Sequence, residues 1–273
     1  MKNILILVFI LLSACASPKK NSTGGNSSSA FEPSDQEINA EAAKAYAEVK
    51  SKSKISTNAR WNAMVQRVSD RIAKASGENF DWEVILIDSP EVNAWCMPGG
   101  KMAVYTGILP VLKTEAALAA VMGHEVAHAT KRHGKKRYSR AIKGNIAGMV
   151  VGGAAIIGGQ LLCKTDTCKL LSTLGGAAAG FAVTFFDRKF SRDDESESDY
   201  EDQIYMAKAG YNPSEAIKVW ERMGAANGGK SPPEFLSTHP SDERRKGNLR
   251  NWLPNAEKVY ANSPVKYGIG EDL

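Results

Sequence analysis

Three residues of the sequence stand in the arrangement H-E-x-x-H, at His124, Glu125 and His128. Residues four apart lie on one face of an α-helix, so both imidazoles can reach a single Zn²⁺ ion. Glu125 then lies beside the metal, where it can take a proton from metal-bound water. The neighbours that make this helix mostly buried are Leu118, Val121, Met122 and Val126. Since buried polar side chains need a partner, the pattern predicts a metal site, with a structural pair of histidines as the alternative.

A third metal ligand must come from elsewhere in the chain, because a catalytic zinc takes three protein ligands and keeps one position for water. The segment 190–202 offers seven carboxylates, most of which we expect on a solvated face. Composition does not choose among them. Glu195 and Asp199 share a helical face, so one can bind the metal while the other orients a ligand histidine. His133 follows His128 by about 500° of helical turn, so we predict that it lies off the ligand face as a structural or exposed residue.

Helices and short strands must position these residues. Ser34 and Glu37 form a capping box, which predicts a helix that continues to about Lys52. A second helix is predicted from about Asn58. Its apolar face holds Trp61, Met64, Val65, Val68 and Ile72. The predicted strands are 82–87, 92–96 and 101–105, and a turn at 97–100 joins the last two.

The helix that carries H-E-x-x-H is predicted from Glu115 to about Arg132, with Gly134 as its C-terminal stop. Further helices are predicted at about 191–210, after Asn212-Pro213, and at about 241–252. These elements divide the chain into four parts. They are a signal peptide at 1–14, Cys15 with a tether at 15–33, a catalytic domain at 34–255 and a tail at 256–273.

The first residues have the anatomy of a secretory signal, with a basic start and a nine-residue apolar run at 4–12. The ending Leu12-Ser13-Ala14-Cys15 resembles the lipobox of bacterial lipoproteins, which implies cleavage before Cys15 and a lipid on that residue. The Ser-, Asn- and Gly-rich stretch 16–33 indicates a flexible tether. We therefore expect a cell-envelope protein that a lipid on Cys15 anchors to the outer membrane, on the side that faces the periplasm.

Two uncharged stretches rich in Gly and Ala, 145–162 and 170–186, follow the H-E-x-x-H helix. Their length could form a transmembrane hairpin, but small residues have weak hydropathy and favour two tightly packed helices. Cys163 and Cys168 flank the turn between the stretches, so we expect a disulfide across it in an exported protein.

The composition excludes some classes of protein. The 273 residues are 43% hydrophobic and 24% charged, close to the globular average, which excludes a disordered or coiled-coil chain. The net charge of +5 is mild and has no basic stripe behind it, so we expect no nucleic-acid partner. One catalytic domain behind a tether is the simplest partition.

Several motifs together resemble the M48 family of zinc metallopeptidases over about residues 35–252, and its soluble, exported, lipoprotein-like branch is the most similar. They are NAWCMPGGK at 93–101, YTGIL at 105–109, GHEVAH at 123–128, SRxxExxxD at 191–199, AGYNP at 209–213, and THPS at 238–241 with Arg245. The resemblance implies a mainly helical α+β fold of the zincin (gluzincin) type, with a small antiparallel sheet and the H-E-x-x-H helix. The sequence departs from the family at Ser198 and Asp202, where Ala and Gly are common.

Carried over by position, the resemblance implies a metal centre with one Zn²⁺. Its ligands would be His124, His128 and Glu195. Glu125 would be the general base. Asp199 falls at an acidic position that supports the ligands from behind.

The resemblance also implies roles at the rim of the site. His239 matches a histidine at the cleft and could stabilise the tetrahedral oxyanion, while Arg245 matches an arginine that helps to build the site. Asn93 and Ala94 fall on an edge strand, where an extended peptide substrate pairs through backbone hydrogen bonds.

These features predict a zinc-dependent endopeptidase that hydrolyses unfolded or misassembled envelope proteins by Glu-assisted attack of a zinc-bound water. The quality-control role rests on family analogy alone. The alternative is a non-enzymatic periplasmic chaperone or assembly factor that holds its clients in the same cleft. A third hypothesis is an integral membrane protease that uses the hairpin as its spans.

Overall fold

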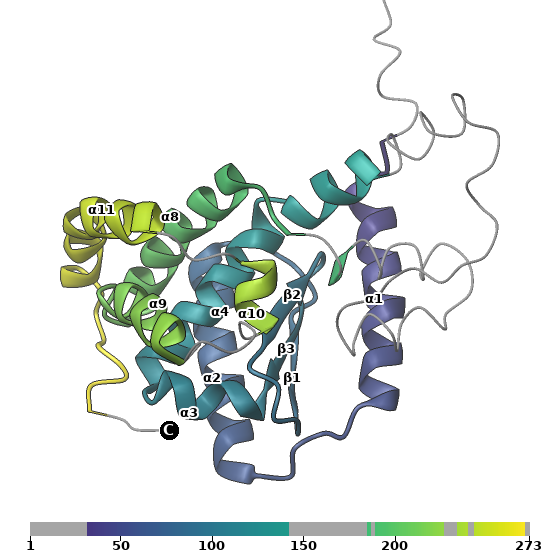
Figure 1. The fold of residues 1–273 in the computed structure, drawn as a ribbon, viewed down its shortest axis with the longest axis horizontal. Helices are drawn as coiled ribbons and strands as arrows, with labels where there is room; N and C mark the ends of the chain where they lie inside the picture. Colours follow the sequence, from purple (N-terminus) through teal and green to yellow (C-terminus); the bar gives the residue numbers. More distant parts are fainter. Residues whose placement is uncertain (1–31, 142–184, 187–188, 227–233, 240–242, 271–273) are drawn as a thin grey trace, which may run out of the picture. The chain divides into compact units, whose positions relative to one another are not determined.

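A computed structural model describes residues 32–141, 185–186, 189–226, 234–239 and 243–270 (Figure 1). These residues belong to a compact unit, Pro33–Leu273, apart from Glu32 at their start. Several predicted features lie outside the described residues: the signal peptide, Cys15 and its tether, Cys163, Cys168, and nearly all of the two uncharged stretches. Within the described part of the chain, no helix is both long enough and apolar enough to cross a membrane.

A three-stranded sheet forms the β part of the fold, in the order β1 (Glu83–Ile87), β3 (Lys101–Tyr105) and β2 (Ala94–Met97). β2 and β3 pair antiparallel, as the sequence predicts for two strands joined by a turn. β1 pairs parallel with β3, so the sheet is mixed rather than antiparallel. The difference arises because β3 inserts between β1 and β2, and that order cannot be deduced from strand propensity.

The two faces of the sheet are buried in two separate hydrophobic clusters. Alternate strand residues such as Leu86, Cys96 and Val104 join a cluster with α2 (Ala59–Ser76) and α4 (Glu115–Thr130). Their neighbours, such as Trp95 and Tyr105, join the other cluster with α1 (Asp35–Lys52). Figure 1 shows α1 on one side of the sheet, with α2 and α4 on the other. The sheet is therefore covered on both faces, and each strand alternates between two cores.

Helix α4 lies at the centre of the larger cluster, and every one of its residues is buried. It packs against α2, α8 (Arg192–Lys208), α9 (Glu215–Ala226) and β2. Apart from its glutamates and histidines, α4 is built mostly of Ala and other small or apolar residues, and a helix of this kind must be enclosed on all sides. The remaining elements are η2 (Thr106–Ile108), α3 (Leu109–Leu112), α10 (Glu234–Thr238) and α11 (Glu243–Ala261). The mainly helical α+β fold class is thus confirmed.

Helix starts follow the predicted chemistry closely. Ser34 and Glu37 form the predicted capping box at the start of α1, and Ser191 caps α8 in the same way through Asp194. Asn58 caps α2 by accepting a hydrogen bond from the Trp61 amide.

Two helix ends differ from the predictions. α4 ends at Thr130, and the left-handed residue beyond it is Arg132, with φ of 58°, rather than Gly134. Residues 133–141 then form a new helix, so Gly134 is helical. α11 continues to Ala261, beyond the predicted end near Trp252, because Leu249 and Ala256 are still buried along it.

Candidate metal centre

Four helical segments bring the predicted site residues together. α4 supplies His124, Glu125 and His128, and α8 supplies Glu195 and Asp199. His239 follows the end of α10, and Arg245 lies in the first turns of α11. All seven side chains are buried. Residues that are 121 positions apart in the sequence (124 to 245) therefore form one enclosed polar cluster inside an apolar core.

Four of these residues could hold a metal ion: His124, His128, Glu195 and His239, whose ligand atoms all lie within 4.8 Å of one another. His124 Nε2 lies 3.0 Å from His128 Nε2 and 3.4 Å from Glu195 Oε2. His128 Nε2 is 3.7 Å from Glu195 Oε1. Zinc bonds of about 2.0–2.1 Å place tetrahedral ligand nitrogens about 3.3–3.4 Å apart, so both the donor atoms and their spacing fit a zinc ion.

Asp199 and Arg245 support the first histidine from behind. Asp199 Oδ1 lies 3.1 Å from His124 Nδ1, the nitrogen turned away from the ligand group. Arg245 donates to both oxygens of this carboxylate, at 2.6 and 2.7 Å. Burial acts to raise the pKa of Asp199, but Arg245 and His124 outweigh it and hold that pKa below its usual value. Asp199 is therefore an anion that can fix the orientation of His124.

Arg245 also reaches the predicted third ligand. Its Nη1 lies 2.8 Å from Glu195 Oε2, and its guanidinium stacks over the Trp220 ring at 3.9 Å. Burial acts to raise the pKa of Glu195, but His239 and Arg245 hold it well below its usual value. One buried arginine thus keeps two carboxylates ionised, as metal binding requires.

Glu125 has a different environment from Glu195 and Asp199. Its side chain points into the cleft, where Oε1 lies 3.3 Å from His239 Nε2 and has no hydrogen-bond partner among the described residues. Burial raises the pKa of Glu125, although His239 and His124 oppose the shift. A carboxylate with a raised pKa is a stronger base than an ordinary one, so Glu125 is suited to accept a proton and pass it on.

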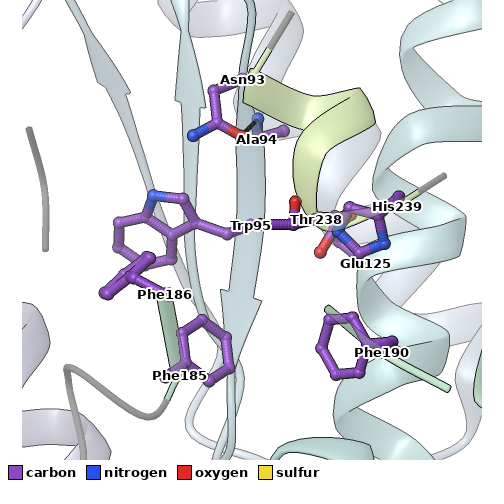
Figure 2. Close-up of a pocket in the computed structure, with 9 residues that line it drawn as sticks. All are labelled: Asn93, Ala94, Trp95, Glu125, Phe185, Phe186, Phe190, Thr238 and His239. Carbon is purple, nitrogen blue, oxygen red and sulfur yellow. Dashed lines mark hydrogen bonds and ion pairs between the residues drawn. The ribbon is translucent and has the colours of Figure 1, made fainter. Parts of the chain in front are cut away.

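A pocket opens beside Glu125 and His239 (Figure 2). Its lining is otherwise mostly apolar and aromatic: Asn93, Ala94, Trp95, Phe185, Phe186, Phe190 and Thr238. Ala94 begins β2, the outer strand of the sheet, and Asn93 directly precedes it. The structure thus places the two predicted edge-strand residues next to Glu125.

His239 lies closer to the ligand group than the sequence reasoning suggests. Its Nδ1 is 3.0 Å from Glu195 Oε1 and 3.3 Å from His124 Nε2, so the ring reaches both the ligand atoms and Glu125. The spacing of His239 from the H-E-x-x-H motif, more than 100 residues, gives no signal of this proximity.

His133 is the residue of the site that sequence reasoning missed. It is fully buried, and its Nδ1 lies 3.0 Å from His128 Nδ1. As helical rotation predicts, His133 is not among the four residues that could hold a metal, and of the two predicted environments it has the buried, structural one. It still reaches the back of His128, because α4 ends at Thr130 and the positive φ of Arg132 turns the chain back. Burial lowers the pKa of His133. The clustering of three histidines within ten residues is the sequence signal that could have included it.

The two departures from the family pattern are both buried beside the site. Ser198 Oγ lies 3.3 Å from His133 Nδ1. Asp202 packs against Gly123, where a Cβ atom would approach Asp202 Oδ1 to 2.2 Å. Burial raises the pKa of Asp202 well above its usual value. A glycine at 123 is needed because the larger residue stands opposite it on α8.

Comparison with known proteins adds a family match. The model for peptidase family M48 matches residues 56–253. The mitochondrial metalloendopeptidase OMA1 of Schizosaccharomyces pombe is 36% identical over 71% of this chain and 53% of that protein. The protein of the same name from Saccharomyces cerevisiae is 34% identical over 68% and 51%. The chain thus spans about half the length of these two relatives.

A bacterial relative is also found. The beta-barrel assembly-enhancing protease of Escherichia coli is 26% identical over 66% of this chain and 36% of that protein. The matches contradict the predicted location at an outer membrane facing the periplasm. Relatives from two yeasts, a plant, cattle and human all carry mitochondrial names. The prediction rested on residues 1–33, which lie outside the matched range, so the domain itself carries no signal for that location.

Proposed function

This chain belongs to peptidase family M48, and we propose that it is a zinc-dependent endopeptidase of unfolded or misassembled proteins. The observation that carries the proposal is the meeting of three ligand side chains, His124, His128 and Glu195, beside a buried Glu125 with an unpartnered oxygen. A structural pair of histidines would need neither that carboxyl group nor a pocket next to it.

Each residue then has a role in peptide hydrolysis. A bound Zn²⁺ supplies a Lewis acid for the scissile carbonyl and a water of lowered pKa. Glu125 takes the proton of the attacking water and passes it to the leaving amine, which its raised pKa favours. Arg245 and Asp199 hold the ligand side chains in place, because they bridge α11 and α8 behind them.

His239 supports the proposal in a second way. Four protein ligands would close the coordination sphere, whereas catalysis requires one open position. We therefore keep the three-ligand set and assign His239 to the oxyanion that develops during attack. Its Nε2 lies 3.3 Å from Glu125 Oε1, and both residues line the same pocket.

The substrate class follows from the pocket and the sheet edge. An extended peptide can pair with the outer edge of β2 beside Ala94, which requires a substrate without its own structure at the cleavage site. Trp95, Phe186 and Phe190 line the pocket next to Glu125, and they suit apolar side chains that a folded protein would bury. The sequence predicts misassembled envelope proteins as clients. The mitochondrial names of the relatives remove the support for that location, so the proposal is limited to unfolded or misassembled proteins.

The Glu125→Gln variant tests the mechanism. Gln keeps the size of the side chain and cannot accept the proton, so hydrolysis of a casein substrate should fall by about 10²–10⁴-fold while zinc remains bound. Zinc content is measured on the same sample by atomic absorption. Undiminished cleavage by the zinc-loaded variant would exclude Glu125 as the general base.

The same assay separates the enzyme from the chaperone alternative. A peptidase loses casein cleavage when a chelator removes the metal and regains it when zinc is returned. Suppression of client aggregation without any chelator-sensitive cleavage would favour a chaperone that uses the same cleft.

A further inference from the structure

The proposed ligand His128 has a support that differs from that of His124. His128 Nε2 faces the ligand group, 3.0 Å from His124 Nε2, so its Nδ1 points the other way. His124 turns its own Nδ1 toward the carboxylate Asp199. Behind His128 lies a second imidazole instead of a carboxylate, since the Nδ1 of His128 is 3.0 Å from His133 Nδ1.

The contact between the two rings fixes which atom carries each proton. A neutral imidazole that binds a metal through Nε2 carries its hydrogen on Nδ1, so His128 is the donor. His133 Nδ1 must then accept, which leaves the hydrogen of His133 on Nε2. This nitrogen lies 3.0 Å from Glu197 Oε2 and 3.5 Å from Asp194 Oδ1. Ionised carboxylates can only accept hydrogen bonds, so Nε2 of His133 must carry the hydrogen. The contacts at both nitrogens of His133 therefore favour the same tautomer, with hydrogen on Nε2.

The surroundings keep this chain of contacts in place. His133 is fully buried, and Phe190 stacks on the His128 ring with centroids 3.8 Å apart. Glu197 is held between Lys131 and Lys136, each at 3.7 Å. The positive φ of Arg132 directs the chain so that residue 133 returns beneath α4.

We propose that His133 is a positioning residue, which accepts the Nδ1 hydrogen of His128 and so holds His128 with Nε2 toward the metal. The inference rests on the proposed zinc ligands and deepens that assignment. Partners of this kind behind a ligand histidine typically contribute 10–100-fold to metal affinity. In most such cases the partner is a carboxylate or a backbone carbonyl. Here the partner is a second histidine, which is itself oriented by its contact with Glu197.

Zinc affinity, measured by competition with a chromophoric chelator, gives the first test. His133→Leu keeps volume and burial but removes the acceptor, and the zinc dissociation constant should rise by about 10–100-fold. His133→Asn places an amide oxygen where Nδ1 stands, so affinity should return to within a few-fold of the wild type. Ser198→Ala is the matched control, because it removes the other neighbour of His133 Nδ1 and should leave affinity unchanged within about threefold.

The tautomers can be read directly in the zinc-loaded wild type by ¹H–¹⁵N NMR of the imidazole rings. The expected pattern has hydrogen on Nδ1 of His128 and on Nε2 of His133. A hydrogen on Nδ1 of His133, or an unchanged zinc affinity in folded His133→Leu, overturns the positioning role. Because the proposed peptidase activity is scored separately with Glu125→Gln, failure here leaves that proposal standing and vice versa.

Discussion

Helix α4 holds two buried glutamates ten residues apart, Glu115 in its first turn and Glu125 at the candidate metal centre. Both are almost inaccessible, with 1% and 2% of their surface exposed. Glu115 accepts hydrogen bonds from Arg67, Arg71 and Tyr211, at 3.1 Å from Arg71 and 2.8 Å from the Tyr211 hydroxyl. Glu125 keeps an oxygen without a hydrogen-bond partner among the described residues.

The difference shows how burial can serve structure at one end of a helix and chemistry at the other. At Glu115 two arginines compensate the charge, and the cluster joins α2, α4 and the segment after α8. At Glu125 the negative charge destabilises the fold, because burial raises the pKa by more than the neighbouring imidazoles lower it. Burial by itself therefore does not mark a functional carboxyl group; at Glu125 burial coincides with an unpartnered oxygen and with a pocket beside it.

Removal of the compensated charge should have the largest effect on stability. Glu115→Gln leaves Arg67 and Arg71 without their anion, and a fully buried pair broken in this way costs about 3–5 kcal/mol. The arginine side chains are 40% and 29% exposed, so we expect a smaller loss, about 2–3 kcal/mol, in urea unfolding. Cleavage per folded molecule should stay within about twofold of the wild type. A variant as stable as the wild type would break the comparison, because Glu115 would then not be structural.

Removal of the uncompensated charge should act in the opposite direction on the metal-free protein. Because the pKa of Glu125 is raised on folding, its ionisation costs stability as pH rises above the ordinary value of 4.5. Glu125→Gln removes that cost, so it should match the wild type below about pH 4.5 and gain on the order of 1 kcal/mol above it. Urea unfolding of the chelator-treated wild type and variant between pH 4 and 8 measures this difference. If the variant instead became less stable than the wild type as pH rises, the charge of Glu125 would be compensated in the folded protein.

A third carboxylate, at the protein surface, serves for comparison with the two buried ones. Asp35 pairs with Lys135 at 2.5 Å and Arg132 at 3.2 Å, but its side chain is 46% exposed. Asp35→Asn should therefore cost less than about 1 kcal/mol, and less still in high salt. The bond to Lys135, with help from Arg132, lowers the pKa of Asp35, so the contribution is present above pH 4 and lost as pH falls through that lowered value. If Asp35→Asn lost as much stability as Glu115→Gln, and lost it independently of salt, the distinction between buried and exposed ion pairs would not hold.

Local chemistry made much of the fold predictable. Capping residues such as Ser34, Asn58 and Ser191 determine where helices start, because they satisfy free amides within a few residues. The H-E-x-x-H spacing likewise depends only on the pitch of α4. These features need no knowledge of the rest of the chain.

Features that depend on tertiary order were not accessible in the same way. The parallel pairing of β1 with β3 follows from which strand inserts in the middle, and the approach of His239 depends on where α10 docks. The contact of His133 with His128 was not predictable from helical rotation, which holds only while the helix lasts, and the left-handed Arg132 lies beyond the end of α4. The pairing of Glu115 with Arg67 and Arg71 also joins distant segments, and nothing in their spacing indicates it.

The order of the site residues along the chain also has a consequence for synthesis. A nascent chain that has reached residue 190 contains His124, Glu125 and His128, but not the carboxylate of Glu195. The arginine that keeps Glu195 and Asp199 ionised arrives later still, at Arg245 in α11. Because the cluster takes residues from α4, α8 and α11, and a domain generally folds as a unit, the cluster is completed late in synthesis. An emerging chain therefore does not carry the complete cluster until Arg245 has been synthesised.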